Sequence, residues 1–214
     1  MAMALVTGLV EESDKKAVLQ NMVDSIYTKG KVLTAGDIGF HFLVKALDDG
    51  GASQLLYDMN NRTDVAGYGF QLKKGATALT ESWAALEEVS NNHLMLGHIM
   101  EWLYSGLAGI GQEENSIGYR HIKIRPQPVG NITSAGASFE CPYGLIVSEW
   151  KKGKDGFLLH VRIPVNTSAT VYFPAAGHAK IYESGRALPA GSIKTAGNTA
   201  LINIQSGEYW FRVK

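Results

Sequence analysis

The stretch His121-Ile122-Lys123-Ile124-Arg125-Pro126 marks where this sequence changes from helical to strand patterning. Polar and apolar residues alternate along it with the period of a half-buried β-strand, and the proline ends the run. Before it, apolar residues recur at the spacing of amphipathic helices; after it, apolar runs are short and bounded by turn residues. The pattern predicts an α+β chain in two parts, a helical segment over residues 1–112 and an antiparallel β-sandwich over residues 113–214.

The helical part carries start and stop signals for several helices. Capping residues, apolar stripes and terminal glycines predict helices over residues 13–30, 40–51, 52–60 and 93–107. The last of these has the most regular apolar face, and Gly109 and Gly111 follow it. The loop over residues 64–70 is too rich in glycine for a stable helix. Met1 to Val10 has the composition of the end of a buried helix.

The second part is predicted to be built from short strands joined by turns. Lys151 to Gly156 has the composition of a hairpin turn. Cys141, the only cysteine, is predicted to be a small buried or edge thiol at a strand end, so that no internal disulfide forms. Strands are predicted over residues 121–125, 145–150, 157–165, 170–173, 179–182, 200–204 and 209–213.

Composition and charge exclude several classes of protein. The 214 residues include 45% hydrophobic and 19% charged residues, which is enough apolar material for a real core. Because 20 basic residues balance 20 acidic ones, the electrostatic footprint of a nucleic-acid-binding protein is missing. The apolar run Met1 to Val10 is short and has no basic flank, so it resembles neither a secretion signal nor a membrane span. We expect neither nucleic acid nor membrane as a partner.

No metal or cofactor is expected from the motifs. The six histidines are scattered, and the closest pair, His93 and His98, is five residues apart and diverges around a helix. No phosphate-binding loop, dinucleotide fingerprint or serine nucleophile elbow is present.

The residues Gly75-Ala76-Thr77-Ala78-Leu79-Thr80-Glu81-Ser82-Trp83 allow two interpretations. Glu81 is either a catalytic carboxylate beside an aromatic residue or a residue that caps or precedes a helix. His93 is, on spacing alone, a residue at a helix N-terminus with Asn91 or Asn92 as the cap. For Glu101, a solvated or hydrogen-bonded role is expected. The residues by themselves leave these alternatives open.

An ordered series of motifs resembles the carboxyl-terminal part of bacterial α-L-rhamnosidases. In the helical part the likeness comprises Gly75-Ala76-Thr77, Glu81-Ser82-Trp83, Asn92-His93, Gly97-His98-Ile99 and Glu101-Trp102-Leu103-Tyr104. In the strand part it comprises residues 118–126, 144–150 and 161–169. The resemblance implies a partial six-hairpin (α/α) toroid followed by the family's closing β-sandwich.

The resemblance also implies an activity and a set of residues. Members of this family hydrolyse terminal α-L-rhamnose from glycosides with inversion, so the expected ligand is a rhamnose-containing glycoside. By position, Glu81 matches the general base and His93 a histidine that lines the rhamnose pocket. Trp83 is expected to wall the site or support the base, and Tyr68 stands where the family usually has a sugar-facing tryptophan.

One part of the family pattern has no counterpart in this sequence. The acidic segment that carries the general acid precedes the base in the family, and nothing before Glu81 resembles it. We therefore expect a fragment that is inactive alone. Its helices would expose apolar faces and associate through them, either as a homo-oligomer or with an upstream catalytic-domain partner.

Two other functions remain open. The strand part would serve as a non-catalytic carbohydrate-binding or interaction module if Trp150, Tyr172 or Tyr182 stacked on sugars, although strand aromatics more often belong to the core. A tail of a helical-toroid lyase or phosphorylase would share the architecture.

Overall fold

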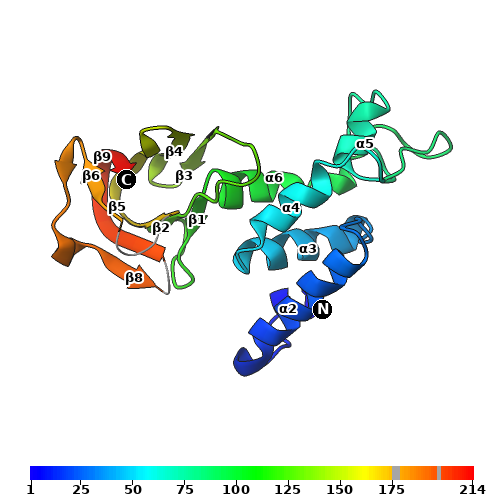
Figure 1. The fold of residues 1–214 in the computed structure, drawn as a ribbon, viewed down its shortest axis with the longest axis horizontal. Coiled ribbons are helices and arrows are strands. Elements are labelled where there is room, and N and C mark those ends of the chain that lie inside the picture. The colour runs from blue at the N-terminus through cyan, green and yellow to red at the C-terminus, as the bar shows by residue number, and fades with distance from the viewer. Residues whose placement is uncertain (175–178, 197–198) are drawn as a thin grey trace. The chain divides into compact units, whose positions relative to one another are not determined.

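The computed structural model describes residues 1–174, 179–196 and 199–214. Two compact units are found within them, Met1–Trp102 and Leu103–Lys214. The first unit is helical and the second is a β-sheet domain, so the predicted α+β class is confirmed (Figure 1).

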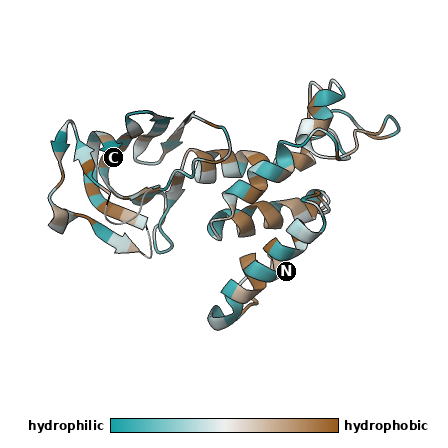
Figure 2. Ribbon diagram, in the orientation of Figure 1, coloured by the Kyte–Doolittle hydropathy of each residue, from teal (hydrophilic) through white to brown (hydrophobic). Residues whose placement is uncertain are grey.

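The helical unit is organised around one strongly apolar helix, α3. Helices α1 (Ala2–Val6) and α2 (Glu12–Thr28) precede it, and α4 (Ser53–Asn60), α5 (Tyr68–Lys73), the 3₁₀ turn η1 (Leu94–Leu96) and α6 (Ile99–Trp102) follow. Apolar residues run along α3 (Asp37–Asp49; Figure 2), and its Phe40, Val44 and Leu47 are completely buried. They share the core with Leu55, Leu56 and Met59 of α4.

The predicted helices over residues 13–30, 40–51 and 52–60 are confirmed as α2, α3 and α4. Helix α5 begins at Tyr68, inside the segment predicted to be a glycine-rich loop, because Gly67 takes the position before its first turn. The N-terminal segment is helical as α1, but none of its residues is buried, contrary to the prediction.

The helix predicted over residues 93–107 is wrong as a continuous element. It is divided into η1, α6 and the π-helical turn η2 (Leu103–Leu107). His93 caps η1 by accepting a hydrogen bond from Met95 N–H, and Gly97 ends that turn. The bond from Ala108 N–H to the Leu103 oxygen, 3.0 Å, has the five-residue spacing of a π turn. The three segments are only 3, 4 and 5 residues long, which is too short for their different apolar periods to be distinguished in the sequence.

The β domain is built on two long antiparallel strands, β5 (Gly156–Phe173) and β9 (Thr199–Val213). Each was predicted as two shorter strands. The register shifts between Ile163 and Ser168, where Asn166 has a φ of +62°, so one strand continues across a bulge.

The bulge divides the sheet into halves that share β5 and β9. The first half of β5 pairs with β4 (Gly144–Gly153), which pairs with β3 (Ser134–Cys141), and the second half pairs in parallel with β2 (His121–Ile124). The remaining strands are β1 (Ile110–Gln112) beside β2, β8 (Lys194–Ala196) and β6 (Ile181–Glu183) beside β9, and β7 (Arg186–Ala187) beside β6; the 3₁₀ turn η3 spans Ala190–Ser192.

Alternate residues of β5 and β9 form the core between the two halves. Val161, Val171, Phe173 and Ala200 are completely buried, while their sequence neighbours Arg162 and Leu201 are not. Cys141 is the last residue of β3 and is buried, as predicted. Within the described part of the chain, no helix has the length and apolar character needed to cross a bilayer.

Candidate functional site

The segment that carries Glu81 is a loop closed by backbone hydrogen bonds. Glu81 N–H donates to the Ser90 oxygen at 2.8 Å, and His93 N–H donates to the Leu79 oxygen at 2.8 Å. These two bonds hold residues 79–81 against residues 90–93 in the manner of an antiparallel pair. Glu81 and His93, twelve positions apart in the sequence, therefore lie on the two paired segments of one loop, Glu81 opposite Ser90 and His93 opposite Leu79.

The loop is tied to the helices through Ser82. Its carbonyl oxygen accepts hydrogen bonds from Thr80 Oγ1 at 2.6 Å and from Gln71 Nε2 at 3.2 Å. Thr80 is completely buried and Gln71 is 3% exposed. Neither residue was identified from the sequence, because nothing in the pattern around Gln71 indicates a partner eleven residues later. Together they fix the backbone on both sides of Glu81.

Three aromatic rings pack together beside this loop. The rings of Tyr68 and Trp83 meet edge to face at 5.1 Å, and Phe40 contacts Trp83 at 4.8 Å and Tyr68 at 5.9 Å. Such edge-to-face arrangements are favourable for aromatic pairs. Phe40 is completely buried whereas Tyr68 and Trp83 are half-buried, so Phe40 supports the two predicted site aromatics from behind.

Hydrogen bonds fix the orientation of both half-buried rings. Trp83 Nε1 donates to the Ala35 oxygen at 2.7 Å, and the Tyr68 hydroxyl donates to the Leu96 oxygen. Burial raises the pKa of Tyr68, although a hydrogen bond with the Ile99 backbone acts in the opposite direction. Tyr68 is therefore a neutral hydroxyl at physiological pH.

The two predicted polar residues differ in exposure. The Glu81 residue is exposed, and its Oε2 accepts a hydrogen bond from Ser90 N–H at 3.1 Å. His93 is half-buried, and its Nδ1 accepts from Met95 N–H at 3.4 Å. In the neutral imidazole the proton then lies on Nε2, which makes that nitrogen a donor. The loop thus presents a solvent-accessible carboxylate and an oriented imidazole from its two paired segments.

Glu101 lies outside this loop and has a hydrogen-bonded role, as expected. Its Oε2 is 3.1 Å from His41 Nδ1, and both side chains are more than a third exposed. The His41 ring in turn lies 5.2 Å from the His98 ring. Among the residues described, no group of histidine, cysteine and acidic side chains has the arrangement of a metal site.

Trp150, one of the predicted sugar-stacking residues of the β domain, is a core residue. It is 3% exposed, its Nε1 donates to the Leu107 oxygen at 2.7 Å, and its ring stacks on Phe157. Tyr172 is half-buried and its hydroxyl contacts Glu113 at 3.3 Å. The exposed tryptophan of this domain is Trp210, at 53%. Its position in an alternating strand carries no signal that distinguishes it from Trp150.

Comparison with known proteins relates both units to one family. Residues 1–107 match the family model of the bacterial α-L-rhamnosidase six-hairpin glycosidase domain, and residues 109–187 match that of the bacterial α-L-rhamnosidase C-terminal domain. An α-L-rhamnosidase of Streptomyces avermitilis is 29% identical over 220 residues, and one of Formosa agariphila is 28% identical over 225 residues. Each alignment covers 99% of this chain but 21% and 24%, respectively, of the relative.

Solved structures give the same relationship. The structure of the Streptomyces avermitilis α-L-rhamnosidase complexed with L-rhamnose superposes over the whole chain with a TM-score of 0.88 and 28% identity, covering 21% of that protein. The α-L-rhamnosidase of Dictyoglumus thermophilum gives the same TM-score at 23% identity and supports the fold alone. The chain spans about a fifth to a quarter of the length of these relatives.

Proposed function

Because this chain belongs to the bacterial α-L-rhamnosidase family, we propose that it supplies one side of a rhamnoside-hydrolysing site. The observation that carries the proposal is the loop over residues 79–93. It joins an exposed carboxylate, an oriented imidazole and a fixed pair of aromatic rings.

In this proposal Glu81 is the general base. An exposed carboxylate is reachable by water, and the hydrogen bond from Ser90 N–H to Oε2 restrains the side chain in one direction. A base that activates water needs this combination of access and orientation. In an inverting enzyme the base stands roughly 6.5–9.5 Å from the acid, which leaves room for the water.

The remaining site residues would bind the sugar. Trp83 and Tyr68 offer an aromatic wall for the apolar face of a pyranose ring, and their hydrogen bonds to Ala35 and Leu96 hold that wall in place. His93, with its proton on Nε2, would donate to a sugar hydroxyl. The ligand is a terminal α-L-rhamnoside, in line with the L-rhamnose bound to the Streptomyces avermitilis relative.

The general acid is proposed to come from residues beyond those of this chain. Without a positioned acid the leaving oxygen is protonated by water, which lowers the rate by roughly 10²-fold or more. The chain alone should therefore bind rhamnose yet hydrolyse an alkyl rhamnoside only at the background rate.

Hydrolysis and binding assays on the isolated chain test this proposal. We expect no turnover of methyl α-L-rhamnopyranoside above background, together with a saturable shift of the Trp83 indole N–H resonance on addition of L-rhamnose. Robust turnover that Glu81→Gln abolishes would overturn the proposed incompleteness. Robust turnover that Glu81→Gln leaves unchanged would overturn the role of Glu81, and an unmoved Trp83 signal would overturn the sugar pocket. Glu87→Gln, an exposed carboxylate of the same loop, is the matched control.

We further propose that other helical hairpins of the same toroid cover the helical unit. The matched family model describes a six-hairpin domain, and the described residues contribute six α-helices. Several large apolar side chains of this unit are exposed: Leu9 at 80%, Ile38 at 67%, Leu72 at 71% and Leu94 at 81%. Exposed apolar area of this kind marks contact surfaces.

Light scattering on the isolated chain tests the covering surface. Without the further hairpins we expect concentration-dependent association and binding of a hydrophobic dye, both reduced by Ile38→Asp or Leu94→Asp. A dispersed monomer that binds no dye would contradict the proposal. A single closed homodimer in light scattering would show that a second copy of the chain, and not further hairpins, covers this surface.

A further inference from the structure

A second group of residues, independent of the Glu81 loop, lies on the outer face of the β domain. Glu149 of β4, His160 of β5 and Trp210 of β9 are directly opposite one another across the three strands. Residues paired in this way project from the same face of a sheet. Their neighbours Trp150, Leu159 and Phe211 are buried on the opposite face, so this row faces solvent.

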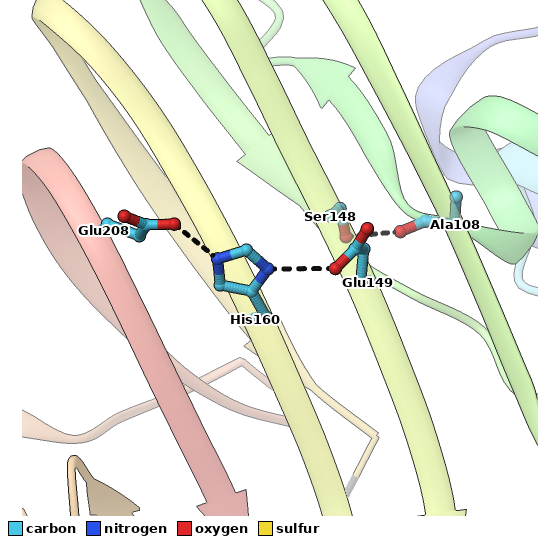
Figure 3. Close-up of polar contacts among 5 residues, drawn as sticks. All are labelled: Ala108, Ser148, Glu149, His160 and Glu208. Carbon is cyan, nitrogen blue, oxygen red and sulfur yellow. Dashed lines mark hydrogen bonds and ion pairs between the residues drawn. The ribbon is translucent and has the colours of Figure 1, made fainter.

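His160 is held at both ring nitrogens. Its Nδ1 lies 3.0 Å from Glu149 Oε2 and its Nε2 lies 2.9 Å from Glu208 Oε1, so that the imidazole bridges two carboxylates (Figure 3). Ser148, the residue before Glu149 on β4, points into the domain, and its hydroxyl donates a hydrogen bond to the Ala108 carbonyl oxygen at 2.6 Å. The ring of His160 is thus fixed in both position and plane.

The fixed imidazole supports the exposed indole of Trp210. The two rings stack with centroids 4.9 Å apart and planes 18° from parallel. On the far side, Ser184 N–H donates to the Trp210 carbonyl oxygen at 3.0 Å and anchors the turn beside it. Tryptophan is highly buried on average, yet 53% of Trp210 is exposed. The result is a rigid aromatic surface presented to solvent.

A hollow of about 580 Å³ extends over this surface. This size is within the range of small-molecule sites, about 300–1,000 Å³. The ring of Trp210 forms the floor of the hollow, and Tyr182 adds a second aromatic side chain to its lining. Acidic and basic side chains around them offer hydrogen-bond acceptors and donors. The polar side chains that line the hollow are Glu149, Lys151, His160, Ser184, Arg212 and Lys214.

We propose that this hollow is a binding site for a saccharide, with the exposed indole of Trp210 as the stacking surface. A pyranose ring has an apolar face of C–H groups and a rim of hydroxyls, each of which donates and accepts. The hollow matches both features, since an aromatic plane is bordered by one carboxylate acceptor, Glu149, and by several cationic donors. The lining holds one carboxylate, Glu149, beside the cationic Lys151, Arg212 and Lys214, so a ligand with many hydroxyls can both donate and accept there.

This site is separate from the proposed hydrolytic one. Every residue that lines it lies between Glu149 and Lys214, in the β domain. Its existence does not depend on the role of Glu81.

The four tryptophan indole N–H resonances of the isotope-labelled chain distinguish the two sites. On titration with methyl β-D-glucopyranoside and with methyl α-L-rhamnopyranoside, we expect a saturable shift of the Trp210 signal, with a dissociation constant in the millimolar range because few groups are contacted. The signals of buried Trp102 and Trp150 should not move. The Trp83 signal reports on the hydrolytic site, so failure of either proposal is visible separately.

Substitution of the stacking residue completes the test. Because substitution of Trp210 removes its indole signal, binding to the variants is followed by the backbone amide signals of Lys151 and Arg212, which line the hollow. Trp210→Ala should weaken binding at this site at least about tenfold, a factor equivalent to 1.4 kcal/mol. Trp210→Tyr, which keeps an aromatic ring, should weaken it only a few-fold. Ile117→Ala, at a residue 88% exposed in the same unit, is the control and should change nothing. A Trp210 signal that stays unmoved up to tens of millimolar sugar, or binding unchanged in Trp210→Ala, overturns the proposal.

Discussion

The indole nitrogen of Trp83 donates a 2.7 Å hydrogen bond to the carbonyl oxygen of Ala35, a residue 48 positions earlier in the chain. Ala35 lies just before α3, so this bond connects the Glu81 loop to the helix that carries Phe40. It also sets the angle at which the Trp83 ring meets Phe40 and Tyr68. The geometry of the aromatic wall therefore depends on one polar contact as well as on ring packing.

Replacement of Trp83 by phenylalanine separates these two contributions. Trp83→Phe keeps an aromatic ring but removes the donor to Ala35. We expect a loss of about 1 kcal/mol in the free energy of unfolding, the net value of one hydrogen bond. Urea denaturation followed by helical circular dichroism measures it. A larger loss of rhamnose binding than of stability would show that ring angle matters to the pocket; an unchanged denaturation midpoint contradicts the structural role.

Trp150 and Trp210 provide a matched pair within the β domain. Trp150→Phe removes a buried donor and leaves the Leu107 oxygen without that partner, which is expected to cost about 1–3 kcal/mol. Trp210→Phe alters an exposed ring and should change stability by about 0.5 kcal/mol or less. Equal shifts in the denaturation midpoints of the two variants would be inconsistent with a buried Trp150 and an exposed Trp210.

Gly109 and Gly75 have nearly the same backbone angle but different surroundings. Their φ values are +86° and +85°, which cost an L-residue about 1–2 kcal/mol. A Cβ at Gly75 would meet no atom within 4 Å, whereas one at Gly109 would lie 2.2 Å from Pro126 N. Gly75→Ala should therefore lower the free energy of unfolding only by the cost of the positive φ, about 1–2 kcal/mol. Gly109→Ala should lose at least about 3 kcal/mol, since the backbone must also move.

Soluble expression and thermal denaturation compare the two glycine variants. We expect Gly75→Ala to fold with a small decrease in Tm and Gly109→Ala to fold poorly or not at all. The prediction fails if both variants lose the same stability.

The ion pairs of His160 predict a pH dependence. Partial burial lowers the pKa of His160. The hydrogen bonds to Glu149 and Glu208, together with the negative charges of these two residues, raise the pKa by more than burial lowers it, so that the net pKa lies above 6.5. Because the folded-state pKa is the higher one, the stabilisation is fully present below about pH 6.5 and is lost as the pH rises through the folded-state value. The carboxylates are about half exposed, so the effect is modest.

An NMR titration of the His160 ring protons measures this pKa directly. Substitution of both partners, Glu149→Gln with Glu208→Gln, should lower it relative to the unmodified chain. Glu140→Gln, an exposed carboxylate on β3, should leave it unchanged. A pKa of 6.5 or below in the unmodified chain would contradict the bridging geometry.

The apolar periodicity of the sequence correctly predicted those helices and strands that bury one face along their whole length. Helix α3 and strand β2 follow their apolar periods because one face of each is buried. The segment after His93 was predicted as one helix because its 3₁₀, α and π segments are each only 3 to 5 residues long, too short to show different apolar periods. Apart from its end at Cys141, strand β3 was not predicted, since its Ser134, Gly136 and Ser138 are not typical strand residues and it forms by pairing with β4. The candidate site shows the same division: Glu81, Trp83 and His93 stand in recognisable motifs, whereas Phe40 and Gln71 support them from distant positions.

By itself, the sequence determined the α+β class and the family to which the chain belongs. These properties depend on local periodicity and on the order of short motifs, which are read along one dimension. Tertiary structure alone decided that Trp150 is buried while Trp210 is exposed, and that His160 bridges Glu149 and Glu208. Both outcomes depend on strand register and on the bulge between Ile163 and Ser168, because pairing across a sheet is set by residues far apart in the chain.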